Sequence, residues 1–226
     1  MNLKEHYSNL YDASIEKIKN NTYEIDDLIE SKNDNRFGIT LLLRPSEAVK
    51  ANIQTFLSEL KAIEPNQYYY ESSDIHITVM SIISCYNGFQ LENINIQDYI
   101  KIIQESLIDS PNIEIQFKGL TASPSCIMLQ GFMNNEALNS IRDDLRQNFQ
   151  NSTLEQSIDQ RYAIQTAHST VVRFKNKLEH KDAFLKTIET FKDKNFGTFK
   201  VHELDLVYND WYQKEALVEK LFQFEL

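Results

Sequence analysis

Glycine is scarce in this chain of 226 residues. Dinucleotide-binding fingerprints and phosphate-cradling loops both need clustered glycines, because their backbone must approach a phosphate closely. Only five glycines occur, and no two lie within four positions of each other: Gly38, Gly88, Gly119, Gly131 and Gly197. The sequence therefore excludes both of these classes of nucleotide-binding protein.

Cysteine and long apolar runs are also scarce. Cys85 and Cys126 belong to no CxxC pair, so a zinc cage is not supported. We expect two buried thiols in a reducing compartment, with a single disulfide as the less favoured alternative. Residues 1–20 carry charges throughout, unlike a secretory signal, and no stretch approaches the roughly 20 apolar residues of a membrane span. We therefore expect a cytoplasmic protein with no membrane partner.

Basic side chains are outnumbered by acidic ones. Lys and Arg total 23 against 33 Asp and Glu, which gives a formal net charge of −10. A field of this sign repels polyphosphate, so we expect no long nucleic-acid duplex as a partner, although a local basic pocket for a nucleotide or short oligonucleotide stays open. The acidic run at residues 24–34 reads as a solvated connection. The carboxylates have no recognisable metal-binding spacing, and we expect no metal and no other cofactor.

Hydrophobic periodicity predicts an α+β protein. Apolar residues at helical spacing predict an opening helix over residues 3–18, and a polar connection follows it. The order strand, helix, strand, helix, strand then occurs twice. The predicted strands are 37–43, 74–83, 113–117, 126–132, 168–174 and 198–207, and the predicted helices of the body are 49–63, 96–109, 138–149 and 184–191. The tail over residues 217–226 fits a strand or a helix, and we favour the strand.

This repeated order predicts two similar lobes whose sheets face each other across a central cleft. No Pro/Gly/Ser-rich linker separates them, so we expect intertwined lobes that form one compact unit. We divide the chain into an N-terminal helix with its connection, residues 1–35, and a bilobal domain, residues 36–226. We expect a monomer.

Two of the five histidines begin the same short pattern. His76 begins His-Ile-Thr-Val-Met, and His168 begins His-Ser-Thr-Val-Val. Residues i and i+2 of a strand share a face, so each imidazole lies beside the hydroxyl of Thr78 or Thr170. One such tripeptide is most simply a core histidine, but two copies in corresponding strands indicate a paired site. The other three histidines have charged or polar neighbours typical of surface or structural positions: His6, His180 and His202.

The paired pattern resembles the two-histidine (2H) phosphoesterase superfamily, which includes bacterial RNA 2′,5′-ligase and cyclic-phosphodiesterase proteins. Arg173 follows the second copy after two apolar residues, as an arginine often does in that family, whereas the first copy has Ser81 there. The resemblance covers roughly residues 36–226. It implies antiparallel sheets with helices outside them. It also implies metal-independent activity on 2′,3′-cyclic phosphates of nucleotides or RNA ends, or on small cyclic nucleotides.

Two imidazoles suit this chemistry. Opening a cyclic phosphodiester needs a base to deprotonate water and an acid to protonate the leaving alkoxide, and imidazole, with an ordinary pKa of about 6.5, does either. The two threonine hydroxyls can donate to the non-bridging oxygens as negative charge develops there. We therefore predict that His76, Thr78, His168 and Thr170 are catalytic, and the sequence leaves open which histidine is the acid.

Substrate-binding residues are predicted from charge and aromatic character. The Arg173 guanidinium can hold phosphate through two bonds, although in a strictly alternating strand it would face away from His168. Aromatic rings at a cleft stack bases, and they also occur as half-buried packing residues. We assign four residues to substrate binding: Arg173, Tyr70, Trp211 and Tyr212.

Two other functions stay open from the sequence. A sugar mutarotase-type isomerase would use the same two imidazoles to open and close a sugar ring. A non-catalytic module would hold a nucleotide or an RNA end without turnover, but binding alone does not require two titratable groups. In every version the negative charge favours a small nucleotide or RNA-end substrate over long RNA.

Overall fold

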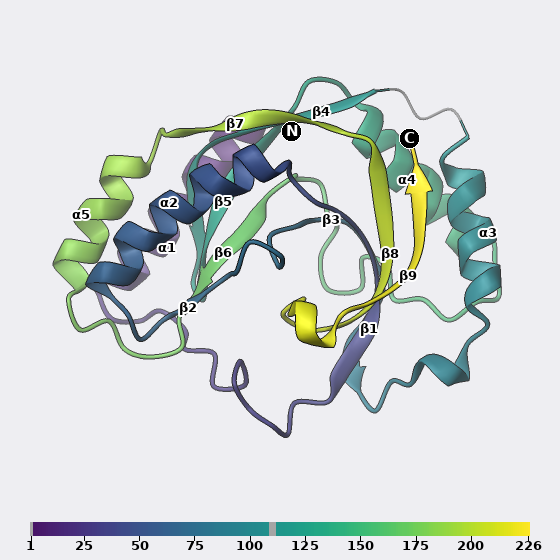
Figure 1. Cartoon of the computed structure of the whole chain (residues 1–226), viewed down its shortest axis with the longest axis horizontal. Coiled ribbons are helices and arrows are strands. Elements are labelled where there is room, and N and C mark those ends of the chain that lie inside the picture. Colours follow the sequence, from purple (N-terminus) through teal and green to yellow (C-terminus); the bar gives the residue numbers. More distant parts are fainter. Residues whose placement is uncertain (1, 109–111) are drawn as a thin grey trace.

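The computed structural model describes residues 2–108 and 112–226, which form two sheets with helices packed outside them (Figure 1). The helices are α1 (Leu3–Lys19), α2 (Glu47–Ile63), α3 (Ile96–Ser106), α4 (Ala137–Gln150) and α5 (Lys181–Phe191), with short 3₁₀ helices at Leu91–Asn93 and Glu215–Leu217. The strands are β1 (Arg36–Leu43), β2 (Tyr68–Tyr69), β3 (Ile77–Asn87), β4 (Ile113–Ser123), β5 (Cys126–Met133), β6 (Ser169–Arg173), β7 (Asn195–Val201), β8 (Glu203–Asp210) and β9 (Glu219–Glu225).

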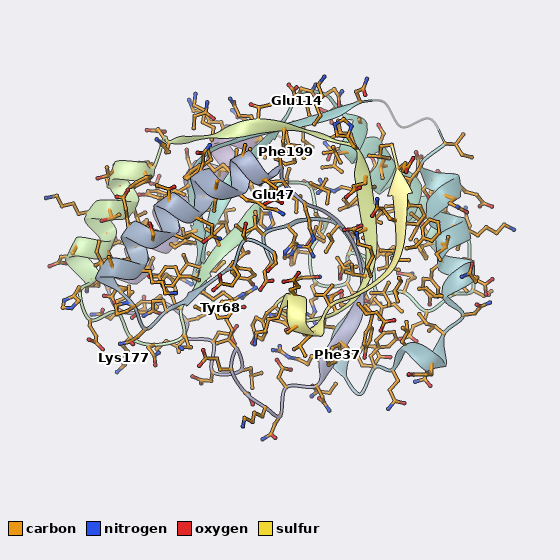
Figure 2. All side chains as sticks on the ribbon, viewed as in Figure 1. Phe37, Glu47, Tyr68, Glu114, Lys177 and Phe199 are labelled. Atoms are coloured by element: carbon orange, nitrogen blue, oxygen red, sulfur yellow. The ribbon has the colours of Figure 1, made fainter. Side chains whose placement is uncertain are left out.

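Every strand pair in the two sheets is antiparallel. The four-stranded sheet has the order β3-β1-β8-β9, and the five-stranded sheet has the order β2-β6-β5-β4-β7. Helices α3 and α4 pack on the first sheet, whereas α1, α2 and α5 pack on the second (Figure 1). Side chains fill the space between these layers, and the exposed Lys177 points outward (Figure 2). The predicted α+β class, with antiparallel sheets and outer helices, is confirmed.

Each sheet draws strands from both halves of the chain. The predicted strand over residues 198–207 is in fact two strands, because β7 ends at Val201, β8 begins at Glu203, and the two belong to different sheets. The apolar period of two changes phase at His202, and this break marks the crossing. That single-strand prediction was wrong. The other predicted elements are present with bounds shifted by a few residues, and Asp109, the predicted end of α3, lies outside the described residues.

Helix α1 packs directly on the five-stranded sheet. The Tyr7 hydroxyl lies 3.2 Å from the backbone oxygen of Gly131, and Ser14 Oγ donates to the backbone oxygen of Ala122 at 3.0 Å. In the other direction, Thr121 Oγ1 donates to the backbone oxygen of Tyr7 at 3.0 Å. The apolar face of α1 belongs to the same core cluster as the strands of both sheets. The opening helix therefore shares the core of the body that follows it.

The structure bears on the two cysteines and on the membrane-spanning helix that the sequence does not predict. Cys85 and Cys126 are both free and buried, as predicted for structural thiols. In residues 2–108 and 112–226, no helix combines the length and the apolar character that crossing a membrane requires.

Gly131 of β5 allows the residue before His168 to approach closely. A Cβ at this position would lie 1.9 Å from the backbone oxygen of Ala167. Gly131→Ala therefore pushes β5 away from the segment that leads into β6, and we expect a loss of about 1–3 kcal/mol in the free energy of unfolding. Chemical denaturation measures this loss, and the imidazole NMR signal of His168 should shift with it.

Gly88→Ala is the control for Gly131→Ala, because a Cβ at Gly88 meets no atom within 4 Å. It introduces strain at a positive φ but should leave the His168 signal in place. An unchanged His168 signal and an unchanged unfolding free energy in Gly131→Ala would contradict the close approach.

Candidate active site

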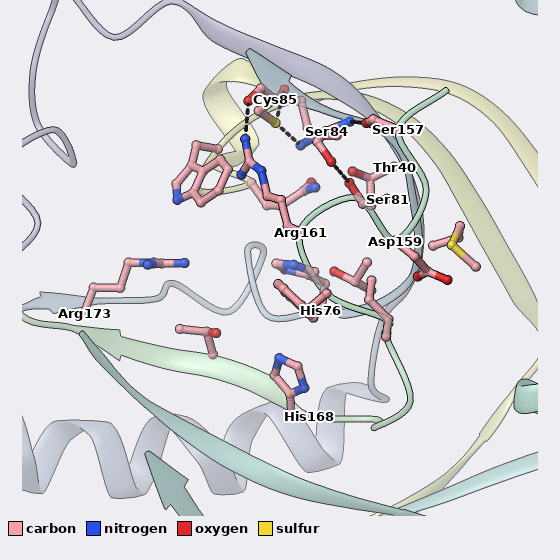
Figure 3. Close-up of a pocket in the computed structure, with 18 of the residues that line it drawn as sticks. Thr40, His76, Ser81, Ser84, Cys85, Ser157, Asp159, Arg161, His168 and Arg173 are labelled. Carbon is pink, nitrogen blue, oxygen red and sulfur yellow. Dashed lines mark hydrogen bonds between the residues drawn. The ribbon is translucent and has the colours of Figure 1, made fainter. Parts of the chain in front are cut away.

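A β-bulge in β6 turns Arg173 toward His168. Consecutive residues of β5 pair with Thr170 and Val172, so Val171 is an extra residue in β6. An extra residue shifts the alternation of side chains by one, and Val171 and Val172 are accordingly both buried. Arg173 therefore lines the same cavity as His168 (Figure 3). The strand does not alternate strictly, so the condition under which Arg173 would face away from His168 is not met.

The first motif has the same irregularity. Consecutive residues of β1 pair with Thr78 and Met80, which makes Val79 the extra residue of β3. The shift brings Ser81 to the cavity together with His76 and Thr78. The two motifs thus present corresponding side chains to one space, but only the second supplies an arginine there.

The cavity lies between the two sheets and has a volume of about 190 Å³. Figure 3 shows the rings of His76 and His168 directed toward the same space, with Arg173 farther along β6. Seven of the eight predicted site residues line the cavity: His76, Thr78, His168, Thr170, Arg173, Tyr70 and Trp211. The structure therefore brings the two motifs together, although they are 92 residues apart in the sequence.

The backbone before β3 fixes the tautomer of His76. Its Nδ1 lies 2.7 Å from the backbone oxygen of Asp74. A carbonyl oxygen only accepts, so Nδ1 carries the proton and the neutral ring keeps a lone pair on Nε2. The Asp74 side chain is held in turn, because its Oδ1 accepts from Ser73 Oγ at 2.8 Å and from the Glu215 backbone N–H at 3.0 Å. Nε2 of His76 is thus the nitrogen available to a ligand.

His168 has a more adaptable partner. Its Nδ1 lies 2.6 Å from Oγ1 of Thr166, a buried residue two positions earlier in the chain. A hydroxyl both donates and accepts, so it serves a neutral imidazole as well as a protonated one. Nε2 of His168 is again the nitrogen that the chain leaves to a ligand.

Burial lowers the pKa of both imidazoles to about 4. Desolvation is the largest cause in each case; the hydrogen bond to Asp74 opposes it at His76, and the charge of Arg142 adds to it at His168. A pKa of about 4, compared with the ordinary value of about 6.5, leaves both rings neutral in the free protein near neutral pH. An anion in the cavity favours the charged form of imidazole and raises its pKa again.

Arg173 is held in place by Tyr70 and Asp26. Arg173 Nε donates to the Tyr70 hydroxyl at 3.0 Å, and Nη1 lies 3.6 Å from Asp26 Oδ2. Burial raises the pKa of Tyr70, which is 2% exposed, so its hydroxyl stays neutral. Tyr70 thus orients the guanidinium. Asp26 belongs to the acidic run that we read as a solvated connection, and this reading misses its contact with the site.

The two aromatic residues that follow β8 lie differently. Trp211 lines the cavity, and the guanidinium carbons of Arg161 and Arg36 lie 4.3 and 4.8 Å from the centre of its ring. Tyr212 is 1% exposed, lies outside the lining, and donates to Asp26 Oδ1 at 2.7 Å. Its hydroxyl also accepts from Arg36 Nη2 at 3.1 Å, so Tyr212 is engaged within the chain, and the substrate contact predicted for it stays a prediction.

The irregular segment between α4 and β6 supplies lining residues that the sequence analysis missed, including Ser157, Arg161 and Tyr162. Ser157 Oγ accepts from the Ser84 backbone N–H at 2.7 Å, and Arg161 Nη2 donates to the Cys85 backbone oxygen at 3.1 Å. These bonds tie the segment to β3. The length of the segment between α4 and β6 could have indicated these residues from the sequence, since long irregular segments in compact domains are commonly functional.

Two amide oxygens in the cavity lining are buried without a hydrogen-bond partner among the described residues, Asn209 Oδ1 and Gln213 Oε1. Asn209 Nδ2 donates to the backbone oxygen of Asp210 at 2.8 Å, which fixes the orientation of that amide. A buried acceptor without a partner costs about 1–3 kcal/mol. Both oxygens are closed to solvent, so a ligand in the cavity does not reach them unless these side chains shift.

The lining offers imidazoles and hydroxyls rather than a cluster of metal ligands. Among residues 2–108 and 112–226, no group of three or more His, Cys, Asp or Glu side chains could hold a metal ion. Asp159 brings a carboxylate to the lining, but its Oδ2 is paired with Arg146 Nε at 2.5 Å.

Solved structures share this fold. TT0787 of Thermus thermophilus matches with a TM-score of 0.59 at 14% identity, over 83% of this chain and 97% of its own. Escherichia coli LigT complexed with 3′-AMP matches with a TM-score of 0.59 at 11% identity, over 84% of this chain and 98% of its own. A structure described as a phosphoesterase matches with a TM-score of 0.57 at 12% identity and the same coverage. No family model and no curated protein matches the sequence.

At these identities the likeness establishes the fold alone. The chain has the fold of the 2H phosphoesterases. The resemblance predicted from the two His-x-Thr motifs is confirmed at this level.

The imidazoles of His76 and His168 should titrate near pH 4 in the free protein. The folded protein disfavours their protonation, so the free energy of unfolding should fall as the pH drops from about 6.5 through about 4. NMR titration of the ring protons, assigned with His76→Gln and His168→Gln, measures the first effect, and denaturation across this pH range measures the second. Ordinary values near 6.5 for both rings would contradict the desolvated site.

Proposed function

We propose that this protein is a 2H-type phosphoesterase that hydrolyses a cyclic phosphodiester without a metal ion. The substrate is the 2′,3′-cyclic phosphate of a nucleotide or an RNA end, or a small cyclic nucleotide. One observation carries the proposal: both His-x-Thr motifs line one cavity, and each histidine has Nδ1 engaged within the chain, so that Nε2 remains for substrate. Two such nitrogens provide an acid and a base for in-line displacement at phosphorus.

His76 serves as the base in this mechanism. Its neutral ring has the proton on Nδ1, so Nε2 accepts a proton from water while the water oxygen bonds to phosphorus. His168 serves as the acid, and its Nε2–H protonates the alkoxide as the bond from phosphorus to that oxygen breaks. The product is a phosphate monoester. The proton that His76 took from water then passes through solvent to His168, which restores the starting protonation of both rings.

The substrate itself supplies the charge that this mechanism needs. Both rings are neutral in the free site, because burial holds their pKa near 4. The phosphodiester anion raises the pKa of the nearby imidazoles and draws one proton into the pair. Thr78 and Thr170 lie two residues after the histidines in the lining, where their hydroxyls donate to non-bridging oxygens as charge grows.

Arg173 anchors the phosphate. Tyr70 engages its Nε, which leaves other N–H groups of the guanidinium to face the cavity. A ring-opening sugar isomerase has no phosphate for this arginine to hold, and a pure binder has no use for paired imidazoles. Arg173 and the histidine pair together therefore favour the phosphoesterase over the mutarotase-type isomerase and the non-catalytic module.

A nucleoside suits the remaining part of the cavity. Trp211 and the guanidinium of Arg161 offer flat surfaces for a base. The structurally similar E. coli LigT has been solved with 3′-AMP. The small cavity and the net charge of −10 favour a nucleotide or an RNA end over a long duplex. We propose a cytoplasmic monomer.

Hydrolysis of 2′,3′-cyclic nucleotides, small cyclic oligonucleotides and an RNA with a cyclic-phosphate end, assayed with EDTA present, tests the proposal. We expect turnover of at least one of these substrates in EDTA. His76→Ala and His168→Ala should each lower kcat by about 10²–10⁴-fold, because each removes one proton transfer. The double variant should be little worse than the worse single variant, since the two residues act together.

His180→Ala is the matched control for these changes, because His180 lies at the start of α5, away from the cavity lining. It should leave turnover unchanged. Complete loss of activity in EDTA, restored by a divalent metal, would refute the two-histidine mechanism. Turnover of a sugar but of no phosphodiester would favour the isomerase, and ligand binding with no turnover would favour the module.

Thr78→Val and Thr170→Val should lower kcat more than substrate affinity. Valine keeps the shape of threonine but removes the hydroxyl that donates to charge formed in the transition state. Arg173→Met should instead mainly raise KM, because the arginine holds phosphate already in the ground state. Steady-state kinetics on the best cyclic phosphate separate the two effects. Equal changes of KM and kcat in all three variants would contradict these roles.

A further inference from the structure

One buried arginine on α4 contacts the backbone of both motifs. Arg142 is fully buried, with 0% exposure. Its Nε donates to the backbone oxygen of Val79 at 3.0 Å, and its Nη2 donates to that of Thr78 at 3.0 Å and of Thr166 at 2.9 Å. Nη1 reaches Asn139 Oδ1, one turn earlier on the helix, at 3.3 Å. A single guanidinium thus links the strand of the first motif to the segment that precedes the second.

The oxygens of Thr78 and Val79 belong to the β-bulge of β3. An extra residue does not match the ladder of its partner strand, so its backbone groups need hydrogen-bond partners from elsewhere. Arg142 supplies these donors. The bulge of β6 is satisfied differently, because Val171 O accepts from the Tyr70 backbone N–H at 3.1 Å. Arg142 therefore supports the local geometry that turns the first motif toward the cavity.

Thr166 extends the contact to the second histidine. Its backbone oxygen accepts from Arg142, and its hydroxyl lies 2.6 Å from Nδ1 of His168. The chain of contacts therefore runs from the β3 bulge through Arg142 and Thr166 to the imidazole ring on the other side of the cavity.

Arg142 also brings a positive charge into the interior, and Asp143 and Asp159 act on it only at longer range. Among the described residues it forms no ion pair, and its hydrogen-bond partners are all neutral oxygens. Burial lowers the pKa of Arg142 to about 10, which leaves it charged at neutral pH. This charge lowers the pKa of His168, and the ionisable side chain of His6 acts in the same direction.

We propose that Arg142 is a positioning residue that holds the two His-x-Thr motifs in their working arrangement across the cavity. The inference rests on the proposed function of the same site. The planar guanidinium donates in three directions at once, which the ammonium of a lysine on a flexible stem does not reproduce. Loss of the guanidinium frees the bulge and the Thr166 segment to move, and a displacement of about 1 Å in a catalytic group costs about 10²-fold in rate.

The test compares Arg142→Met with Arg142→Lys. Arg142→Met removes both the hydrogen bonds and the charge, and we expect kcat to fall about 10²-fold with KM within about threefold of wild type. Arg142→Lys keeps the charge and part of the hydrogen bonding, so its kcat should lie between those of Arg142→Met and wild type. The pKa of the His168 imidazole, followed by NMR, should rise in Arg142→Met and stay low in Arg142→Lys.

Arg146→Met is the matched control, one turn further along α4. Arg146 pairs with Asp143 and Asp159 and is not among the charges that lower the pKa of His168. This variant should lose stability while the His168 pKa stays at its wild-type value. If Arg142→Met loses only stability, with kcat and the His168 pKa unchanged, then Arg142 is a structural residue and the inference is wrong.

Thr166→Val keeps the inference testable where the Arg142 variants do not fold. It removes only the hydroxyl beside His168, so we expect a nearly unchanged Tm, a shifted His168 signal and a lower kcat. An unchanged His168 signal would overturn the link through Thr166. If the wild type hydrolyses no cyclic phosphate, the proposed function fails, but the NMR signals of His168 in these variants still decide the role of Arg142.

Discussion

One extra residue in each of two strands determines the cavity. Val79 in β3 and Val171 in β6 are bulged, and each bulge shifts the following side chains by one position. Ser81 and Arg173 reach the cavity for this reason. The irregularities need partners for their displaced backbone groups, and these come from Arg142 on α4 for the first bulge and from the segment beside β2 for the second. Helix α4 and the edge of the five-stranded sheet at β2 thereby help to shape the site.

Desolvation is the second constraint on the site. The cavity between the sheets withdraws both imidazoles from water, and this lowers their pKa well below the ordinary range. Near neutral pH, a pair that stays neutral without ligand takes up a proton when an anion binds beside it. Substrate binding and the protonation of the catalytic pair are therefore coupled in the proposed mechanism, since each favours the other.

Periodicity and motif spacing predicted much of this molecule. Helical and strand periods indicated the α+β class, and the two His-x-Thr copies identified imidazoles that line one cavity. The bulges could not be predicted from the sequence, because a run such as Thr170-Val171-Val172 has the same apolar pattern as an ordinary buried strand. The roles of Arg142 and Asp26 depend on contacts distant in sequence, and neither residue lies in a recognisable pattern. The burial of Tyr212 beside the lining Trp211 likewise depends on packing.

Proton uptake on ligand binding tests the central claim most directly. A nucleoside 3′-(methyl phosphate) that lacks the 2′-hydroxyl carries one negative charge, does not titrate near neutral pH and cannot be cyclised. Calorimetric titration near pH 6, in buffers of different ionisation enthalpy, counts the protons taken up when it binds. The account predicts uptake approaching about one proton by wild type, and markedly less by His76→Ala or His168→Ala. Binding with no proton uptake by wild type would contradict the coupling of the two histidines to the phosphate.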